Sequence, residues 1–272
     1  MATETTDLVL GGDGLIGSEL MRALTTQGRR PVSLDLKTGC DLRLVDDAPF
    51  AAAERVWFLA WDTGGAKYIE AADRQHEMYK HNCELSARVF DALARTQKPF
   101  LFITSQLAGQ RNAYGLTKLL AEQWTLQLGG KLARLWNTYG WEEPDTRSHV
   151  ITDLVLSGLT RGRVKTLTNG QERRRFIYKS DCVAALLRLF DGAETTADIS
   201  GDAWYSIRQI AEEIASQLNI EIELGEATGN ELIVDPVNIL SGWHPVVTLT
   251  QGVSNVIADA RQYLSHQDNL KT

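Results

Sequence analysis

A glycine-rich turn between an apolar segment and an amphipathic segment is the feature that most restricts how this chain can fold. Residues 7–11 read DLVLG, a short apolar run that predicts a buried strand. Glycines recur at positions 11, 14 and 17, and apolar residues then follow at helical spacing from 15 to 27. In such a unit Gly11 allows a tight turn, Gly14 lets the backbone approach a diphosphate, and Gly17 lets the helix pack on the strand. Because a helix N-terminus offers free N–H groups to phosphate, the turn predicts a dinucleotide site.

Strand and helix patterns alternate through the first half of the chain. Apolar runs at 31–36, 55–60, 99–105 and 131–136 predict further strands, and segments 68–96 and 113–128 predict long helices. Continuous apolar strands are typical of a parallel sheet that is covered on both faces. We therefore predict an α/β fold in which residues 1–140 form a Rossmann-type doubly wound parallel sheet with right-handed crossovers.

The pattern changes after residue 140. Helices are predicted at 150–160, 181–190 and 207–218, and short strands at 175–179 and 220–224. We predict that residues 141–272 form a smaller mixed α/β lobe that binds substrate, with the option that part of this later chain returns to the first domain.

An acidic residue follows the second predicted strand. Asp35 stands where a carboxylate can bind both hydroxyls of a ribose and repel the 2′-phosphate of NADP. The glycine turn and Asp35 together therefore predict NAD as the cofactor.

Ser105, Tyr114 and Lys118 form a candidate catalytic group. Tyr114 and Lys118 lie four residues apart on a predicted helix and share a face, and a nearby ammonium lowers the pKa of a phenol. Such a tyrosine can act as an acid and base near neutral pH. Ser105 ends the preceding strand, at the carboxyl edge where ligands bind in open α/β sheets, and could hold the reacting oxygen. A surface pair on a helix is the alternative interpretation of the tyrosine and lysine.

Composition narrows the other possibilities. The 272 residues carry a formal net charge of -7, which argues against nucleic acid as a partner. The three cysteines are scattered, so neither a disulfide framework nor a metal site is expected. No apolar run approaches the roughly 20 residues that cross a bilayer, and the polar N-terminus is unlike a signal peptide. We expect a cytoplasmic protein without a membrane partner.

Several segments together resemble the extended short-chain dehydrogenase/reductase family, in the branch of nucleotide-sugar epimerases and dehydratases. They are GGDGLIG (11–17), Asp35, CDL (40–42), FLAWDTGG (58–65), HN (81–82), FITS (102–105), YGLTK (114–118), LWNTYG (135–140), RRFIYKSD (174–181) and SGWHP (241–245).

This resemblance implies roles for the matching positions. The cofactor would be bound by the glycine turn and by residues after the next strands, namely Gly11, Asp13, Gly14, Leu15, Ile16, Gly17, Asp35, Asp41, Leu42, Leu59, Ala60, Trp61, Asn82, Tyr114 and Lys118. The diphosphate sugar would be bound by Ser105, Gln106, Asn137 and Arg174.

The resemblance implies epimerisation at C4 of a nucleotide sugar through a 4-keto intermediate. Gln106 and Leu107 follow Ser105, where dehydratases and decarboxylases of the family place acids, which counts against those reactions. The alternatives are a 4,6-dehydratase, a 4-ketosugar reductase, and an NAD-binding regulatory protein without turnover, which the short spacing between Ser105 and Tyr114 keeps open. Relatives often dimerise through two helices, and Leu119, Leu120 and Trp124 would supply that face or belong to the core.

Basic residues cluster in the second half of an otherwise acidic chain. They are Arg161, Arg163, Lys165, Arg173, Arg174 and Arg175. One interpretation is a clamp for the substrate diphosphate, since guanidinium groups bind phosphate oxygens in pairs. The other is a solvated strand pair with alternating charges.

Overall fold

The computed structural model describes residues 6–145 and 147–269, which divide into two compact units. The first unit contains the chain up to Leu135 together with Cys182–Ile199 and Pro236–Trp243. The second contains Trp136–Asp181, Ser200–Asp235 and the chain from His244. Residues 1–5, most of the segment compared above with signal peptides, lie outside the described residues.

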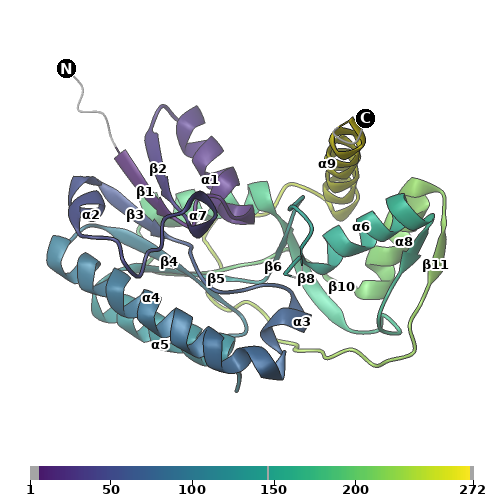
Figure 1. The fold of residues 1–272 in the computed structure, drawn as a ribbon, viewed down its shortest axis with the longest axis horizontal. Helices are drawn as coiled ribbons and strands as arrows, with labels where there is room; N and C mark the ends of the chain where they lie inside the picture. Colours follow the sequence, from purple (N-terminus) through teal and green to yellow (C-terminus); the bar gives the residue numbers. More distant parts are fainter. Residues whose placement is uncertain (1–5, 146, 270–272) are drawn as a thin grey trace. The chain divides into compact units, whose positions relative to one another are not determined.

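A six-stranded parallel sheet forms the centre of the first unit (Figure 1). Its spatial order is β2-β1-β3-β4-β5-β9, and every neighbouring pair is parallel. The strands are β1 (Thr6–Leu10), β2 (Arg30–Leu34), β3 (Arg55–Phe58), β4 (Phe100–Ser105), β5 (Lys131–Leu135) and β9 (Thr196–Ile199). The predicted doubly wound parallel sheet is thereby confirmed, and β9 shows that the later chain supplies its last strand.

Helices cover both faces of this sheet. They are α1 (Leu15–Thr26), α2 (Ala48–Ala52), α4 (Gln75–Thr96), α5 (Ala113–Gln127) and α7 (Lys179–Asp191). Val56 and Phe58 of β3 pack in one core with Phe90 of α4, whereas Trp57 stacks on Phe190 of α7 with ring centroids 4.5 Å apart. Figure 1 shows α4 and α5 side by side along one face, with α1 and α7 on the other. Burial on both faces explains why Val56, Trp57 and Phe58 are consecutive apolar residues.

The single helix predicted over 68–96 is wrong. The structure has α3 (Ala66–Ile69), a 3₁₀ turn (Ala72–Arg74) and only then α4. The side chain of Gln75 donates its amide to the carbonyls of Ile69 and Ala71, each at 3.0 Å, and accepts the N–H of Ala113 at 2.8 Å. One side chain thus satisfies carbonyls that a continuous helix would have used itself. No glycine or proline marks this break in the sequence.

The second unit is mixed α/β. Its sheet has the order β10-β8-β6, and a separate parallel pair joins β11 to β7. The strands are β6 (Asn137–Tyr139), β7 (Arg163–Lys165), β8 (Arg173–Tyr178), β10 (Trp204–Ser206) and β11 (Glu221–Glu223), and the helices are α6 (Val150–Arg161), α8 (Ile207–Leu218) and α9 (Leu249–Asn269). Ile151, Ile214 and Val256, one from each helix, meet in the apolar core of this unit. A capping box between Ser206 and Gln209 begins α8 at the predicted position.

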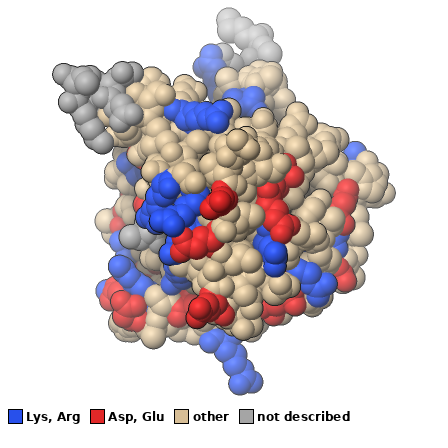
Figure 2. Space-filling view, turned by 90° about the vertical axis from the view of Figure 1, so that its right-hand side faces the viewer, with Lys and Arg blue, Asp and Glu red and all other residues tan. Residues whose placement is uncertain are grey.

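Two residues of the basic cluster, Arg163 and Lys165, belong to a strand pair with alternating charges. Glu223 of β11 binds Arg163 at 3.1 Å and Lys165 at 2.6 Å, both from β7. These charges are exposed, so the pairing contributes little to stability. On the face drawn in Figure 2, Lys and Arg side chains likewise lie among Asp and Glu side chains rather than in one large patch of a single sign.

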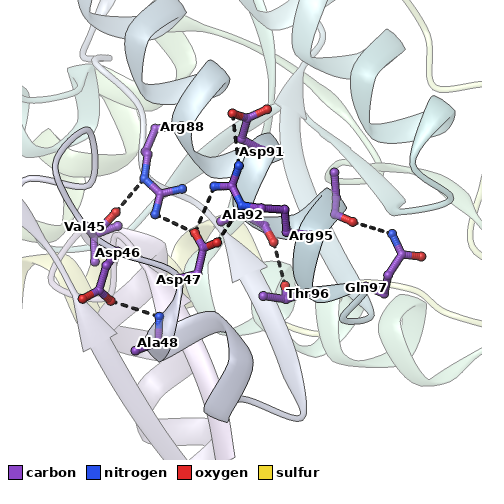
Figure 3. Close-up of polar contacts among 11 residues, drawn as sticks. Val45, Asp46, Asp47, Ala48, Arg88, Asp91, Ala92, Arg95, Thr96 and Gln97 are labelled. Carbon is purple, nitrogen blue, oxygen red and sulfur yellow. Dashed lines mark hydrogen bonds and ion pairs between the residues drawn. The ribbon is translucent and has the colours of Figure 1, made fainter.

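The loop before α2 is anchored to α4 by ion pairs (Figure 3). Asp47 accepts hydrogen bonds from Arg88 at 2.7 Å and from Arg95 at 2.6 Å, and Arg88 also donates to the carbonyl of Val45 at 2.6 Å. The hydrogen bonds from Arg95 and then Arg88 hold the pKa of Asp47 far below its usual value. These contacts hold the segment that follows Asp41, a predicted cofactor residue.

A fully buried carboxylate anchors the first strand of the sheet. Asp7 is paired with Arg29 and Arg55, and it accepts the indole N–H of Trp57 at 2.8 Å. Arg55 in turn reaches Asp191 at 2.6 Å, at the end of α7. The charges therefore compensate one another inside the unit, and each depends on its partner.

We expect Asp7→Asn to lower the free energy of unfolding by about 3 kcal/mol, because it leaves the buried Arg55 facing a neutral group. Urea unfolding followed by circular dichroism measures this. Asp191→Asn is the matched control, since its side chain is 63% exposed and the loss should stay below about 1 kcal/mol. Equal losses for the two variants would contradict the buried-charge account.

Candidate active site

The glycine turn leaves room for a ligand only where a diphosphate would lie. A Cβ on Gly17 would lie 2.0 Å from the carbonyl oxygen of Gly11, so no other residue fits there. Gly11 has φ +87° and a Cβ on it would lie 2.7 Å from the backbone nitrogen of Ala60. Beside Gly14 the nearest atom is 3.6 Å away, and no side chain caps the helix that starts at Leu15. The N–H groups of the first turn of α1 thus fit the diphosphate of a dinucleotide.

Asp35 is held against the same turn. Its carboxylate accepts the backbone N–H of Asp13 at 2.9 Å and that of Lys37 at 2.8 Å. Ser33 donates to the Asp13 carboxylate at 2.7 Å, so strand β2 and the glycine turn are joined at this edge. A fixed carboxylate beside the turn fits the predicted contact with ribose hydroxyls.

The predicted adenine residues lie just beyond. Leu42 is buried in the core under α4, and Asp41 forms a two-pronged ion pair with Arg43. The hydrogen bond from Arg43 lowers the pKa of Asp41 to about 2. The structure therefore shows Asp41 bound to a residue of its own loop, and its contact with a cofactor stays a prediction.

The loop after β3 is positioned by a buried amide. Leu59 and Ala60 both donate their N–H groups to the carbonyl of Leu10, at 2.9 and 2.8 Å. Asn82 of α4 is fully buried, accepts the N–H of Asp62 at 2.9 Å and donates to its carbonyl at 3.3 Å. Asn82 thus shapes the loop that carries the predicted cofactor residue Trp61. The indole nitrogen of Trp61 is buried and has no hydrogen-bond partner within the described residues.

Ser105 and Tyr114 meet at the carboxyl edge of β4. Asn112 caps α5 by accepting the N–H of Gly115 at 2.8 Å, which sets Tyr114 in the first turn. The phenol is hydrogen-bonded to the hydroxyls of Ser105 and Thr63. Burial raises the pKa of Tyr114, and these two hydrogen bonds lower it only in part. The phenol is therefore protonated at neutral pH in this state.

Thr63 is a member of this group that sequence reasoning missed. It lies in the FLAWDTGG segment, two residues after Trp61, and its hydroxyl reaches the reactive phenol. The segment was recognised, but only folding shows which of its side chains turns toward Tyr114.

Lys118 lies one turn along α5 but points into the protein. Its ammonium donates to the carbonyl of Ile103 at 2.8 Å and lies 4.1 Å from the ring centroid of Trp61. The distance to the ring centroid of Tyr114 is 5.9 Å. Burial lowers the pKa of Lys118 well below its usual value, while Glu122 opposes that shift. Burial raises the pKa of Tyr114 more than its hydrogen bonds lower it, and the effect of Lys118 on that pKa stays a prediction.

Gln106 places an unsatisfied acceptor next to Ser105. Its backbone N–H continues the sheet by donating to Leu135 at 2.9 Å, and the Ser105 hydroxyl accepts the N–H of Leu107 at 3.1 Å. The side-chain oxygen Oε1 of Gln106 is buried without a donor within the described residues. Leaving such an oxygen unpaired costs about 1–3 kcal/mol, which a ligand hydroxyl would recover.

The two predicted substrate residues of the second unit lie on neighbouring strands. Asn137 of β6 is opposite Phe176 of β8, and its amide donates to the carbonyl of Arg175 at 3.4 Å. Arg174 hydrogen-bonds to the carbonyls of Arg173 and Asn230. Arg175 is bound to Asp235 and to the carbonyl of Gly201. The diphosphate contacts of Asn137 and Arg174 stay predictions.

Among the helices that the structure describes, none combines the length and the apolar character that a bilayer crossing requires. Within residues 6–145 and 147–269, no group of three His, Cys, Asp or Glu side chains is arranged to hold a metal ion.

Known proteins resemble this chain in sequence and in fold. UDP-glucuronic acid decarboxylase 5 of Arabidopsis thaliana is 30% identical over 149 residues, which cover 51% of this chain and 43% of that protein. UDP-glucose 4-epimerase of Thermotoga maritima has a TM-score of 0.80 at 19% identity, covering 96% of this chain and 100% of that one. UDP-glucuronic acid 4-epimerase of Bacillus cereus has a TM-score of 0.82 at 18% identity, covering 95% and 100%. At these identities the structural matches show the shared fold, and the chain spans less than half the length of the decarboxylases that it matches.

A parallel sheet with a glycine turn after β1 and an acidic residue after β2 is the architecture of a dinucleotide-binding fold. The sequence profile of the NAD dependent epimerase/dehydratase family matches residues 8–199, and the chain belongs to this family. The predicted family and its cofactor, NAD, are confirmed.

We expect Gly14→Ala to weaken NAD binding by about tenfold or more, because the new methyl group enters the space beside the turn. Isothermal titration calorimetry with NAD measures this. The backbone at Gly14 has φ -81°, which alanine adopts without strain, so the melting temperature without NAD should hold. Unchanged affinity would show that the diphosphate lies elsewhere.

Proposed function

We propose that this chain is a nucleotide-sugar epimerase that acts at C4 with Tyr114 as the acid and base. The observation that carries the proposal is the phenol of Tyr114, held between the hydroxyls of Ser105 and Thr63 at the carboxyl edge of β4. Family membership and the likeness to 4-epimerases in fold support it.

Each residue then has a defined task. When bound, NAD supplies the hydride acceptor and donor for C4 of the sugar. Ser105 orients the C4 oxygen, and Tyr114 in its phenolate form would take the proton of that hydroxyl on Oη and later return it. Gln106 offers its buried Oε1 to a neighbouring sugar hydroxyl.

The residues beside Ser105 favour epimerisation over reactions at other carbons. Removing water or a carboxylate needs a group that exchanges a proton with carbon, whereas the amide of Gln106 and the alkyl chain of Leu107 exchange none near neutral pH. The similarity to UDP-glucuronic acid decarboxylases supports decarboxylation as the second candidate. A 4,6-dehydratase, a 4-ketosugar reductase and an NAD-binding regulator remain as further outcomes of the assay.

We expect the purified protein to interconvert UDP-glucose and UDP-galactose, or another C4 pair in a panel of UDP-, dTDP-, GDP- and CDP-sugars, without net consumption of cofactor. Tyr114→Phe should lower turnover by about 100-fold or more and leave NAD affinity unchanged. Tyr79→Phe on the exposed surface of α4 is the matched control and should keep full activity. Mass spectrometry separates the products, because dehydration and decarboxylation change the mass.

No product from any sugar would instead support the regulatory alternative. Retained turnover in Tyr114→Phe would remove this residue from the mechanism.

We propose further that the chain is cytoplasmic, that its substrate is a nucleotide-diphosphate sugar, and that two copies pair through α4 and α5. Leu116, Leu119 and Leu120 of α5 are 40%, 39% and 51% exposed, as is expected for a helix face that a second copy covers. Trp124 stacks on Phe90 with ring centroids 5.1 Å apart, so it belongs to the internal core.

We expect the double variant Leu119→Glu and Leu120→Glu to be a monomer in solution where the unmodified protein is a dimer, because charges would be buried at the interface. Light scattering after size-exclusion chromatography measures the mass. Leu167→Glu is the control, since Leu167 is 62% exposed and belongs to the second unit, whereas α4 and α5 belong to the first. A monomeric unmodified protein would overturn the pairing.

A further inference from the structure

Glu122 is a buried acid that the proposed reaction does not use. It lies on α5, four residues after Lys118, and both side chains are nearly inaccessible at 4% and 3% exposure. Residues four apart on a helix share a face, and this face is pressed onto β4. Lys118 donates to the carbonyl of Ile103 at 2.8 Å, and Glu122 accepts the hydroxyl hydrogen of Thr104 at 2.8 Å. The two opposite charges therefore dock on consecutive residues of the strand that ends in Ser105.

The carboxylate of Glu122 also makes an ion pair with a neighbouring strand. Its other oxygen lies 3.1 Å from the guanidinium of Arg134 on β5. Arg134 also reaches Asp198 of β9 at 3.2 Å, and Asp198 accepts the N–H groups of Val237 and Asn238. Two cations, Lys118 and Arg134, and two anions, Glu122 and Asp198, thus lie in this part of the unit, and their charges sum to zero.

The surroundings of Lys118 would otherwise favour the neutral amine. The rings of Trp61 and Phe102 lie 4.1 and 4.6 Å from its nitrogen, and burial penalises the charged form. Strand β4 adds the carbonyl of Ile103, and the ring centroid of Tyr114 on α5 lies 5.9 Å from the ammonium. The negative charge of Glu122 opposes the effect of burial, because it raises the pKa of Lys118.

We propose that Glu122 is a positioning residue for the Tyr114–Lys118 pair, because its carboxylate keeps the buried ammonium of Lys118 charged. This inference rests on the proposed function, because only that reaction gives the charge of Lys118 a use. A phenol that is buried beside a neutral amine resists losing its proton, whereas an ammonium stabilises the phenolate. Glu122 therefore acts through Lys118 and touches neither cofactor nor substrate.

Nuclear magnetic resonance of lysine side chains tests this without any substrate. Protein labelled with ¹³C at the lysine ε-carbon reports the charge of each amine, and Lys118→Arg assigns the resonance. In Glu122→Gln we expect the pH midpoint of Lys118 to fall by about one unit or more, because the compensating charge is gone. Thr104→Val is the matched control, since it removes the other hydrogen bond to Glu122 and leaves the charge.

An equal midpoint in Glu122→Gln and the unmodified protein would overturn the proposal, as would an equal fall in Thr104→Val. If Glu122→Gln does not fold, Arg134→Met serves, because removing this cation should raise the midpoint of Lys118. An unchanged midpoint there also contradicts the proposal.

Activity then separates this inference from the proposed function. Turnover of Glu122→Gln should be lost at lower pH than that of the unmodified enzyme, because deprotonation of Lys118 inactivates the site and now occurs earlier. If the midpoint shifts but no nucleotide sugar is converted by either protein, the role of Glu122 stands and the proposed function fails.

Discussion

The site depends on how α5 is attached to β4. Burying an ammonium and a carboxylate costs several kcal/mol for each ion unless both are paired and hydrogen-bonded. Lys118 and Glu122 meet that requirement through Ile103, Thr104 and Arg134. The register between helix and strand follows, because a shift of one turn would leave both charges unpaired. Ser105 ends that strand and Tyr114 begins that helix, so the same attachment brings their hydroxyls together.

The chemistry of the site is selected by side chains that differ little in shape. A glutamine and a glutamate at position 106 would occupy the same volume, but only the acid could exchange a proton with a sugar carbon. With Gln106 buried and its oxygen unpaired, the site offers a hydrogen bond and leaves proton transfer to Tyr114. Epimerisation then needs only hydride transfer at C4 and proton transfer at the oxygen on C4. We therefore favour it over dehydration and decarboxylation.

The sequence predicted the regular helices and strands well. It predicted neither the break between α3 and α4 nor the directions of single side chains. The strands at 55–60 and 99–105 and the helix at 207–218 follow from patterns of neighbouring residues, which the folded chain preserves. The end of α3 depends instead on Gln75, whose amide binds carbonyls that a helix would have used. Likewise, helical spacing predicts that Lys118 lies near Tyr114, but only the structure shows that its ammonium binds the carbonyl of Ile103.

By itself, the sequence determined the parallel sheet, the glycine turn, the acid at position 35 and the family, because all of them are read from patterns of neighbouring residues. Only the tertiary structure decided that Thr63 joins Ser105 and Tyr114, that Asn82 shapes the loop at Asp62, and that Glu122 binds Thr104 and Arg134. These contacts join segments that are far apart along the chain. Their energies depend on burial, and burial is a property of the packed molecule rather than of any segment.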